Sequence, residues 1–382
     1  MKKELSLYIH IPFCNSKCNY CSFVSQVGTE DEKNRYIKNL KKEIIIQAKN
    51  YNAFYNIRTI FIGGGTPSCL NGGQIKEILQ TIYKYFTVKN NAEITIELNP
   101  NTITKEKVRE YILSGINRFS IGLQCASQNV LTEMGRTHSL SDFNNAIEII
   151  REHGISNINA DIIIGYPNQK MSDITDTIKH LIELNIPHIS TYMLSVEEGT
   201  KLYSLVDKQQ KILPNENQVI KMYNTVYSTL KKYGYNRYEV SNFAKPGFMC
   251  SHNLVYWNRE DYLGLGVAAH SFIDETRFAN TERLKQYNEC IENKSKPPTS
   301  TAKKLTKKER KEEFVMLSLR TAKGLDTNLY YQIFKENFIT QNKDKLSEFI
   351  KLKLLTIDRD GVVKATNTGF LVLNKIILEL CS

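Results

Sequence analysis

Short apolar runs alternate with longer segments of helical periodicity over the first half of the chain. The apolar runs lie at residues 5–11, 59–62, 93–98, 118–123, 159–164 and 188–194. In the segments between them, apolar side chains recur at intervals of three or four residues. These segments are residues 31–50, 73–86, 104–113, 141–153 and 172–184. The alternation predicts an α/β fold built from six repeated strand–helix units around a parallel sheet.

Six units are too few for the closed eight-unit barrel that such repeats can form. We therefore predict an incomplete (β/α)6 TIM-type barrel, open at its side, for residues 1–200. Residues 201–295 contain a predicted helix at 215–233 and then many loop residues, and we assign them to an extension of the barrel. Residues 294–311 include Pro297, Pro298 and many lysines, a composition that predicts a linker.

Residues 305–382 have the pattern of a small α+β domain. Helices are predicted at 307–322, 328–336, 343–351 and 370–380, with short strands on either side of the Asp360-Gly361 turn. The first three helices and the two-strand wing predict a winged-helix-like domain. Related helical folds read DNA, but the last helices carry no dense stripe of Lys and Arg. We expect a lid or docking role and no nucleic-acid partner.

Composition and charge narrow the function only slightly. The chain has 382 residues, with 51 Lys and Arg against 40 Asp and Glu, which gives a net charge of +11. A positive net charge is compatible with nucleic acid, membrane surfaces or carboxylate ligands as partners, and it does not distinguish between these three classes. No apolar run approaches the length of a membrane span, and the chain enters a strand where a signal peptide would have its apolar core. We expect a cytoplasmic protein.

The most specific chemical signal is a C-x3-C-x2-C motif after the first strand. Its thiols are Cys14, Cys18 and Cys21. Thiolates select zinc, copper(I) or iron–sulfur clusters. A zinc ribbon needs a fourth ligand, usually from a second paired knuckle, which the sequence lacks. A [4Fe-4S] cluster held by three cysteines has one open iron. The other five cysteines are scattered, as is typical of small buried residues.

A second motif, Gly-Gly-Gly-Thr-Pro at residues 63–67, follows the second strand. Together with the cysteine motif and the aromatic Tyr20 before its third cysteine, it resembles the radical S-adenosylmethionine (SAM) superfamily. The resemblance begins at Tyr8-Ile9-His10-Ile11-Pro12-Phe13-Cys14 and extends to the C-terminal domain. Within the superfamily, the chain is similar to the branch shared by anaerobic coproporphyrinogen III dehydrogenase (HemN) and the HemW-type heme chaperones.

This resemblance implies two cofactors, a [4Fe-4S] cluster and SAM. The three motif cysteines would hold three irons, and the amino and carboxylate groups of SAM would chelate the fourth. Carboxylates suit the ammonium and ribose hydroxyls of SAM, and a guanidinium suits its carboxylate. Taken singly, the polar members of the implied set could be ordinary residues of a barrel rim. The implied SAM contacts are Tyr8, Tyr20, Gly63, Gly64, Gly65, Thr66, Glu97, Gln124, Arg136 and Asp161.

Residues 252–257 read His-Asn-Leu-Val-Tyr-Trp and match the H-N-x-x-Y-W motif of HemW-type proteins. The match implies heme as cargo, with His252 as an axial ligand and Tyr256 and Trp257 packed on the macrocycle. Without the resemblance, His252 would be taken as a satisfied loop residue and the aromatics as core. His270 is expected near the same pocket, and we do not assign it as a ligand.

Two features separate the branches of the family. The dehydrogenase carries a further cysteine two residues after the third, where this chain has Phe23, and an extension ahead of the first strand. Here seven residues precede Tyr8. Both departures argue against the decarboxylating oxidation that the dehydrogenase performs.

We therefore predict a heme chaperone without coproporphyrinogen dehydrogenase activity, which transfers heme to client hemoproteins. The basic surface would attract heme propionates or the anionic lipids at the inner face of the membrane, where respiratory clients sit, and a homodimer is a further expectation. The alternatives are oxygen-independent coproporphyrinogen III oxidation, radical-mediated heme ring opening by methyl transfer, and a zinc-stabilised nucleic-acid-binding protein.

Overall fold

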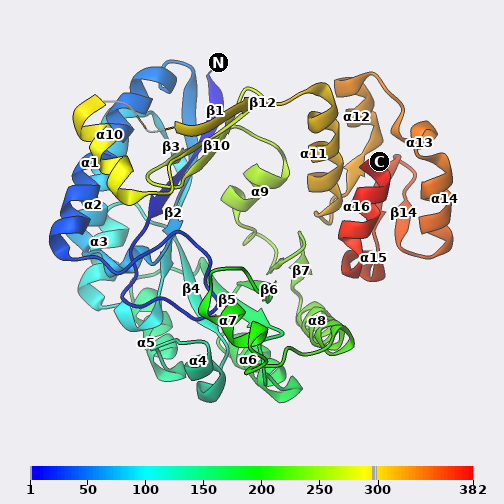
Figure 1. The fold of residues 1–382 in the computed structure, drawn as a ribbon, viewed down its shortest axis with the longest axis horizontal. Helices are drawn as coiled ribbons and strands as arrows, with labels where there is room; N and C mark the ends of the chain where they lie inside the picture. Colours follow the sequence, from blue (N-terminus) through cyan, green and yellow to red (C-terminus); the bar gives the residue numbers. More distant parts are fainter. Residues whose placement is uncertain (1, 295–296, 298, 382) are drawn as a thin grey trace.

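The computed structural model describes residues 2–294, 297 and 299–381, which form a curved sheet with helices on its outer side and a separate C-terminal domain (Figure 1). The described residues exclude five positions. These are residues 1 and 382 of the predicted domains and residues 295, 296 and 298 of the predicted linker.

The six predicted strand–helix units are confirmed. Strands β1 to β6 pair in parallel and in chain order. The strands are β1 (Lys3–Ile11), β2 (Tyr55–Gly64), β3 (Val88–Leu98), β4 (Arg118–Gln124), β5 (Ile158–Ile164) and β6 (His188–Met193). The helices are α1 (Glu30–Tyr51), α2 (Gly72–Tyr85), α3 (Lys105–Leu113), α5 (Leu140–Glu152) and α6 (Met171–Glu183), with a short additional helix α4 (Gln128–Glu133).

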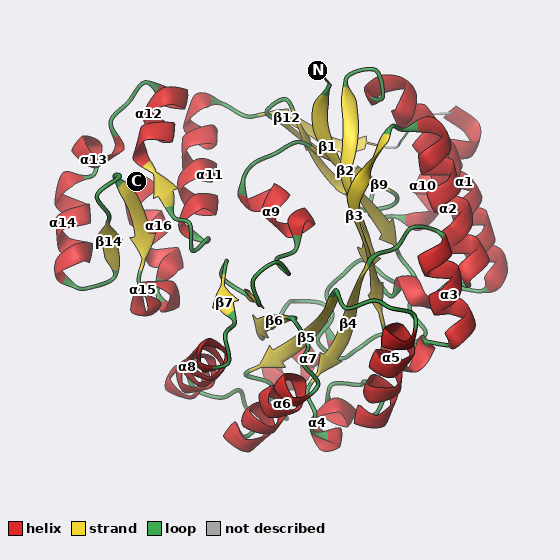
Figure 2. Cartoon of the chain, turned by 180° about the vertical axis from the view of Figure 1, so that it is seen from behind, coloured by secondary structure: helices red, strands yellow, loops and turns green. Residues whose placement is uncertain are grey.

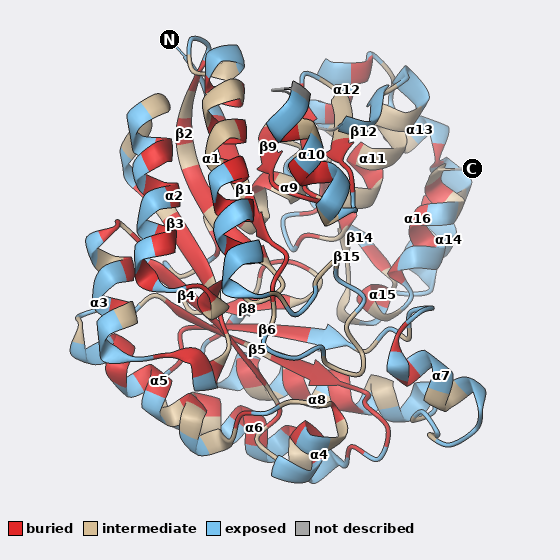
Figure 3. Cartoon of the chain, turned by 60° about the vertical axis from the view of Figure 1, so that its left-hand side comes forward, coloured by how far each residue is buried: buried red, intermediate tan, exposed pale blue. Residues whose placement is uncertain are grey.

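Strand periodicity divides each strand into a helix-facing side and an interior side. In β1, Leu5, Leu7 and Ile9 are fully buried in the core beneath the helices. Tyr8 and His10 alternate with them on the other face of the strand, where Tyr8 lines a cavity inside the barrel and both residues line an open groove. Figure 3 shows the same division in the helices, whose buried faces turn toward the sheet. The alternation along each strand thus places apolar side chains against the helices and polar side chains toward the interior of the barrel.

Residues 201–294 extend the same sheet at both edges. β9 (Tyr262–Leu265) pairs in parallel with β1, and β8 (Asn242–Ala244) pairs antiparallel with β6. Within the described residues the order is β12-β11-β10-β9-β1-β2-β3-β4-β5-β6-β8-β7, an open sheet. The other elements are α7 (Lys201–Asp207), α8 (Glu216–Lys232), β7 (Asn236–Arg237), α9 (Ser251–Trp257), β10 (His270–Ile273), β11 (Thr276–Asn280) and α10 (Leu284–Lys294).

Two expectations for this region were wrong. The H-N-x-x-Y-W motif, expected in loop-rich chain, forms helix α9, which lies on the inner side of the curved sheet (Figure 2). The predicted linker contains strand β12 (Thr299–Lys304), which pairs with β11. All six residues of β12 are exposed. The strand therefore lacks the apolar alternation by which a strand is predicted from sequence, and its pairing with β11 defines it.

The C-terminal domain has its own apolar core, which includes Phe314, Leu325 and Val363. Its wing contains three strands where two were expected, because the short β13 also pairs with β15. The elements are α11 (Lys307–Leu319), β13 (Leu325–Asp326), α12 (Thr327–Phe334), α13 (Phe338–Gln341), α14 (Lys343–Lys351), β14 (Leu355–Ile357), β15 (Val362–Ala365), α15 (Asn367–Leu371) and α16 (Leu373–Cys381).

Ion pairs and one stacked arginine hold the C-terminal domain beside the barrel. Glu313 of α11 accepts from Arg259, which follows α9, and from Arg277 of β11. The guanidinium of Arg237 lies 3.6 Å from the ring centroid of Phe370. These contacts place the C-terminal domain next to α9. None of the described helices is long and apolar enough to cross a membrane.

Candidate cofactor site

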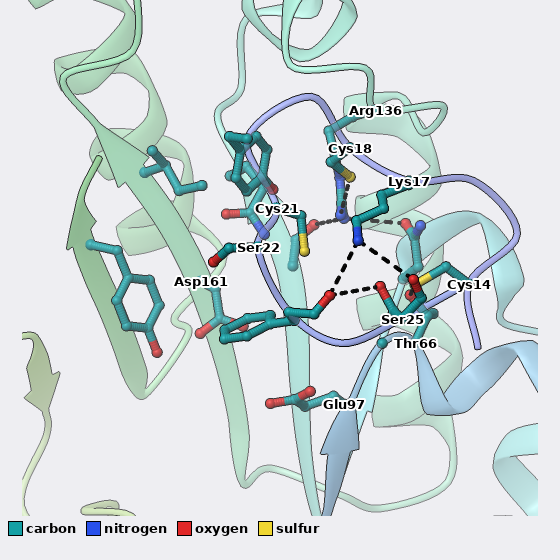
Figure 4. Close-up of a pocket in the computed structure, with 18 of the residues that line it drawn as sticks. Cys14, Lys17, Cys18, Cys21, Ser22, Ser25, Thr66, Glu97, Arg136 and Asp161 are labelled. Atoms are coloured by element: carbon teal, nitrogen blue, oxygen red, sulfur yellow. Dashed lines mark hydrogen bonds between the residues drawn. The ribbon is translucent and has the colours of Figure 1, made fainter. Parts of the chain in front are cut away.

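A pocket of about 380 Å³ opens where the parallel strands end (Figure 4). The cysteine loop after β1 and the glycine loop after β2 form one side of it, and the ends of β3, β4 and β5 form the other. Such strand ends are where βα-barrel proteins place their chemistry. The predicted residues that line this cofactor pocket are Cys14, Cys18, Tyr20, Cys21, Gly64, Gly65, Thr66, Glu97, Gln124, Arg136 and Asp161.

The cysteine loop is anchored at both ends and along its length. The Cys14 amide donates to the Gln26 carbonyl at 3.0 Å, and the Asn19 amide donates to the Met134 carbonyl at 2.9 Å. A loop fixed in this way presents its side chains to the pocket.

Two of the three thiols accept hydrogen bonds from neighbouring loops. The Thr66 hydroxyl lies 3.5 Å from Cys14 Sγ, and Arg136 Nη1 lies 3.6 Å from Cys18 Sγ. These two contacts fix the Cys14 and Cys18 sulfurs at the wall of the pocket. Burial raises the pKa of the Cys21 thiol.

The donor set fits a [4Fe-4S] cluster with one open iron, since three free thiols face one pocket. Among residues 2–294, 297 and 299–381, no three His, Cys, Asp or Glu side chains converge at the spacing of metal ligands. The three thiols thus share the pocket without meeting at one point.

Gly64 and Gly65 let the backbone pass close to the cysteine loop. Gly64 has a φ of 116°, and a Cβ there would lie 2.6 Å from the His10 ring. A Cβ on Gly65 would lie 2.6 Å from the Phe13 carbonyl oxygen. The Gly64 amide donates to Glu97 at 3.1 Å. A side chain at position 65 would push the glycine loop away from the cysteine loop, and one at position 64 would push it away from His10 of β1.

Two carboxylates line the pocket, Glu97 beside the glycine loop and Asp161 on β5. Removal from water, and secondarily the nearby Asp161, raises the pKa of Glu97 to about 8. Removal from water also raises the pKa of Asp161, although that carboxylate accepts from Asn159 at 2.8 Å and Ser120 at 3.2 Å. Poorly solvated acceptors of this kind gain most from a ligand that brings hydroxyl or ammonium donors.

Arg136 and Gln124 complete the rim. Arg136 Nη2 donates to the Gly122 carbonyl at 2.8 Å and to Asn99 Oδ1 at 3.3 Å, which fixes the guanidinium beside Cys18. Gln124 has a φ of 67° at an irregularity that ends the pairing of β4 with β5. Such sparsely populated backbone conformations cluster at ligand sites.

Two of the predicted SAM residues lie outside the pocket. Tyr8 lines a cavity of about 200 Å³ deeper in the barrel, whose wall also includes Glu97, Asp161 and His252. Gly63 lines neither cavity, and a Cβ there would lie 3.0 Å from the Glu97 carboxyl, so this glycine makes room for Glu97.

The residues that line the pocket without having been predicted include the polar Asn99, Ser120 and Tyr192. The period of two along β4 could have identified Ser120, because it lies on the same face as Gly122 and Gln124.

The predicted heme motif lies inside the barrel. His252 is 1% exposed, with Nδ1 2.7 Å from Thr59 Oγ1 and Nε2 2.8 Å from the Tyr256 hydroxyl. Its backbone amide donates to Glu93 of β3 at 2.9 Å. Burial, and then the nearby Arg118, lower the pKa of His252 to about 3. Both ring nitrogens are therefore occupied within the protein. Trp257 lines neither of the two cavities.

Comparison with known proteins identifies the family. Residues 8–181 match the radical SAM superfamily, and residues 305–372 match the HemN C-terminal domain. The chain is 32% identical to the heme chaperone HemW of Lactococcus lactis over 378 residues, which cover 98% of this chain and 97% of the relative. It is 36% identical to the heme chaperone HemW of Escherichia coli over 267 residues, which cover 70% of this chain and 69% of that relative.

Among solved structures, the coproporphyrinogen III oxidase HemN from Escherichia coli matches with a TM-score of 0.87. The two chains are 24% identical, and the match covers 100% of this chain and 91% of that one. At this identity the match establishes the fold, and it confirms the partial barrel with its C-terminal domain. The sequence relatives go further and confirm the resemblance: the chain belongs to the HemW family of the radical SAM superfamily.

Proposed function

We propose that the protein is a heme chaperone, which binds a [4Fe-4S] cluster, SAM and heme and transfers the heme to client hemoproteins. One observation carries the proposal: the similarity to relatives named heme chaperones extends over 98% of this chain and 97% of the Lactococcus relative. The gathering of most predicted cofactor residues around one pocket supports it.

In this proposal the cysteine loop holds the cluster through Cys14, Cys18 and Cys21. When bound, the cluster supplies one iron that the protein leaves open to SAM. Arg136 is held at the rim with its charge toward the pocket, where it can pair with a carboxylate. Glu97 and Asp161 accept hydrogen bonds from the hydroxyl and ammonium groups of SAM.

Phe23 favours a chaperone over the oxidase. This residue stands two positions after the third cysteine, where the dehydrogenase branch has a further cysteine, and its side chain is 67% exposed at the mouth of the pocket. An exposed phenylalanine offers an apolar contact and no thiol chemistry. The pocket also keeps both partly buried carboxylates, Glu97 and Asp161, and for this reason coproporphyrinogen III oxidation is the second candidate.

Anaerobic reconstitution with iron and sulfide, followed by three assays on one preparation, tests the proposal. Iron–sulfur absorption and SAM binding test the cofactors. Heme titration and transfer to an apo-hemoprotein test the chaperone function. Release of CO₂ from coproporphyrinogen III tests the oxidase. Stoichiometric heme binding and transfer without CO₂ release is the expected result. Turnover of coproporphyrinogen III without heme transfer would contradict the proposal.

A further inference from the structure

A heme iron needs a nitrogen lone pair that is accessible and not already hydrogen-bonded. Four histidines, His10, His138, His188 and His252, have partners at both ring nitrogens. His270 differs from all of them. It is exposed at the start of β10, and within the described part of the chain its ring has no hydrogen-bond partner. Its imidazole is thus free to bind a ligand.

His270 lines an open groove of about 350 Å³, which we call the His270 groove. Aromatic side chains from three parts of the chain form its walls, namely Tyr8, Phe23, Tyr256 and Tyr262. The rings of Tyr256 and Tyr262 meet edge to face, 4.7 Å apart between centroids. Aromatic walls around a free imidazole are the surroundings that a planar iron porphyrin requires.

The groove connects two features that the sequence singled out. Tyr256 belongs to the H-N-x-x-Y-W motif, and its hydroxyl is held by His252 Nε2 at 2.8 Å. Ser22 and Phe23 of the cysteine loop line both this groove and the cofactor pocket. A molecule in the groove would therefore lie next to the cluster loop.

We propose that the His270 groove is where heme binds and that His270 is the axial ligand of its iron. His252 is then a positioning residue, which fixes Tyr256 as part of the wall. This inference rests on the proposed function and names the site that carries it out. An open groove leaves much of the macrocycle exposed, as a carrier that must release its cargo requires.

The charges beside the groove set the orientation of the heme. Lys17 lines the adjacent cofactor pocket, with Nζ 3.3 Å from the carbonyl oxygen of Phe23, a residue shared by the pocket and the groove. Glu282 is the acidic group among the described lining residues. Because a propionate is repelled by Glu282 and attracted by Lys17, the propionates point out of the groove toward Lys17.

Heme titration of the reconstituted full chain tests the assignment with three variants. His270→Ala should weaken heme binding at least about tenfold and abolish the optical and paramagnetic resonance signature of histidine ligation. Added imidazole should restore that signature in His270→Ala. His252→Gln should keep the histidine signature. His153→Ala, which changes a histidine at the end of α5 on the outside of the barrel, is the control.

Two results would overturn the assignment of His270 while the proposed function stands. Either His270→Ala keeps wild-type affinity and spectrum, or His252→Gln alone loses the histidine signature. If the wild-type protein shows no saturable heme binding, the proposed function fails together with this inference.

Discussion

Oγ1 of Thr59 lies 2.7 Å from Nδ1 of His252, inside the barrel. The same hydroxyl donates its proton to Ser6 Oγ at 2.8 Å, so it accepts from His252 and fixes the proton on Nδ1. Nε2 then accepts from the Tyr256 hydroxyl. The H-N-x-x-Y-W motif thus also takes part in a hydrogen-bond network, which joins α9 to β1 and β2.

Replacement of His252 by alanine should destabilise the fold. It removes two buried hydrogen bonds, leaves the hydroxyls of Thr59 and Tyr256 with one fewer partner and opens a cavity. We expect a loss of about 2–4 kcal/mol in the free energy of unfolding, measured by urea denaturation. His270→Ala is the matched control, because an exposed ring without partners should change stability by less than about 0.5 kcal/mol. Equal stability of the two variants would contradict the network.

The low pKa of His252 should make stability depend on pH. Its pKa is about 3 in the folded protein, against an ordinary value of 6.5. The unfolded chain therefore takes up a proton between these values that the folded protein does not, and stability falls as pH decreases through this window. His252→Gln should reduce the slope by up to about 1.4 kcal/mol per pH unit.

Urea denaturation of both proteins between pH 6.5 and pH 4 measures this difference. The comparison with the variant is needed because the raised pKa of Glu97, about 8, acts in the opposite direction. Parallel curves for the two proteins would show that His252 does not titrate as the structure indicates.

Replacement of Gly64 by alanine should damage the proposed SAM site. The φ of 116° is unfavourable for alanine, and the Cβ would contact the His10 ring. We expect a stability loss of about 1–3 kcal/mol and at least about tenfold weaker SAM binding, measured by thermal unfolding and calorimetry. Gly73→Ala, in the first turn of α2, is the control because a Cβ there has only the Asn71 amide oxygen nearby, at 3.3 Å. Unchanged SAM affinity in Gly64→Ala would show that the glycine loop does not contribute to SAM binding.

Single replacement of Cys14, Cys18 or Cys21 by serine should abolish the cluster. The measurements are iron and acid-labile sulfide per chain, together with visible absorption after reconstitution. Cys69 provides a close control, since it follows the glycine loop in a 3-10 turn but does not line the pocket. Cys69→Ser should retain a full cluster, and loss of the cluster in that variant would reveal a fourth thiol ligand.

The sequence predicted the parts of the fold that depend on local patterns. Strands β1 to β6 and their helices follow from periods of two and three to four residues, and the end of each strand indicated where the pocket residues would gather. The pairing of β9 with β1 has no local signal, because it depends on two segments far apart in the chain. Strand β12 was missed because an exposed edge strand buries no apolar face.

The same distinction applies to the site. Motif residues such as Cys14 and Asp161 line one pocket because each follows or belongs to a strand of known order. The burial of His252 and the exposure of His270 could not be predicted, since they depend on where α9 packs against β2 and β3. Sequence patterns identify residues with functional side chains, whereas the solvent accessibility of those side chains depends on packing between segments that are far apart in the chain.

The central position of β1 also has a consequence for the order of folding during synthesis. β1 is synthesised well before β9, which completes one of its edges through the pairing of Ser6 with Tyr262. Tyr262 emerges roughly 250 residues later, which at about 5–20 residues per second is a delay of roughly 10–50 s. During that interval the nascent barrel carries an unpaired strand edge, the kind that recruits other chains. This edge of β1 is therefore open to misassociation until β9 has been synthesised.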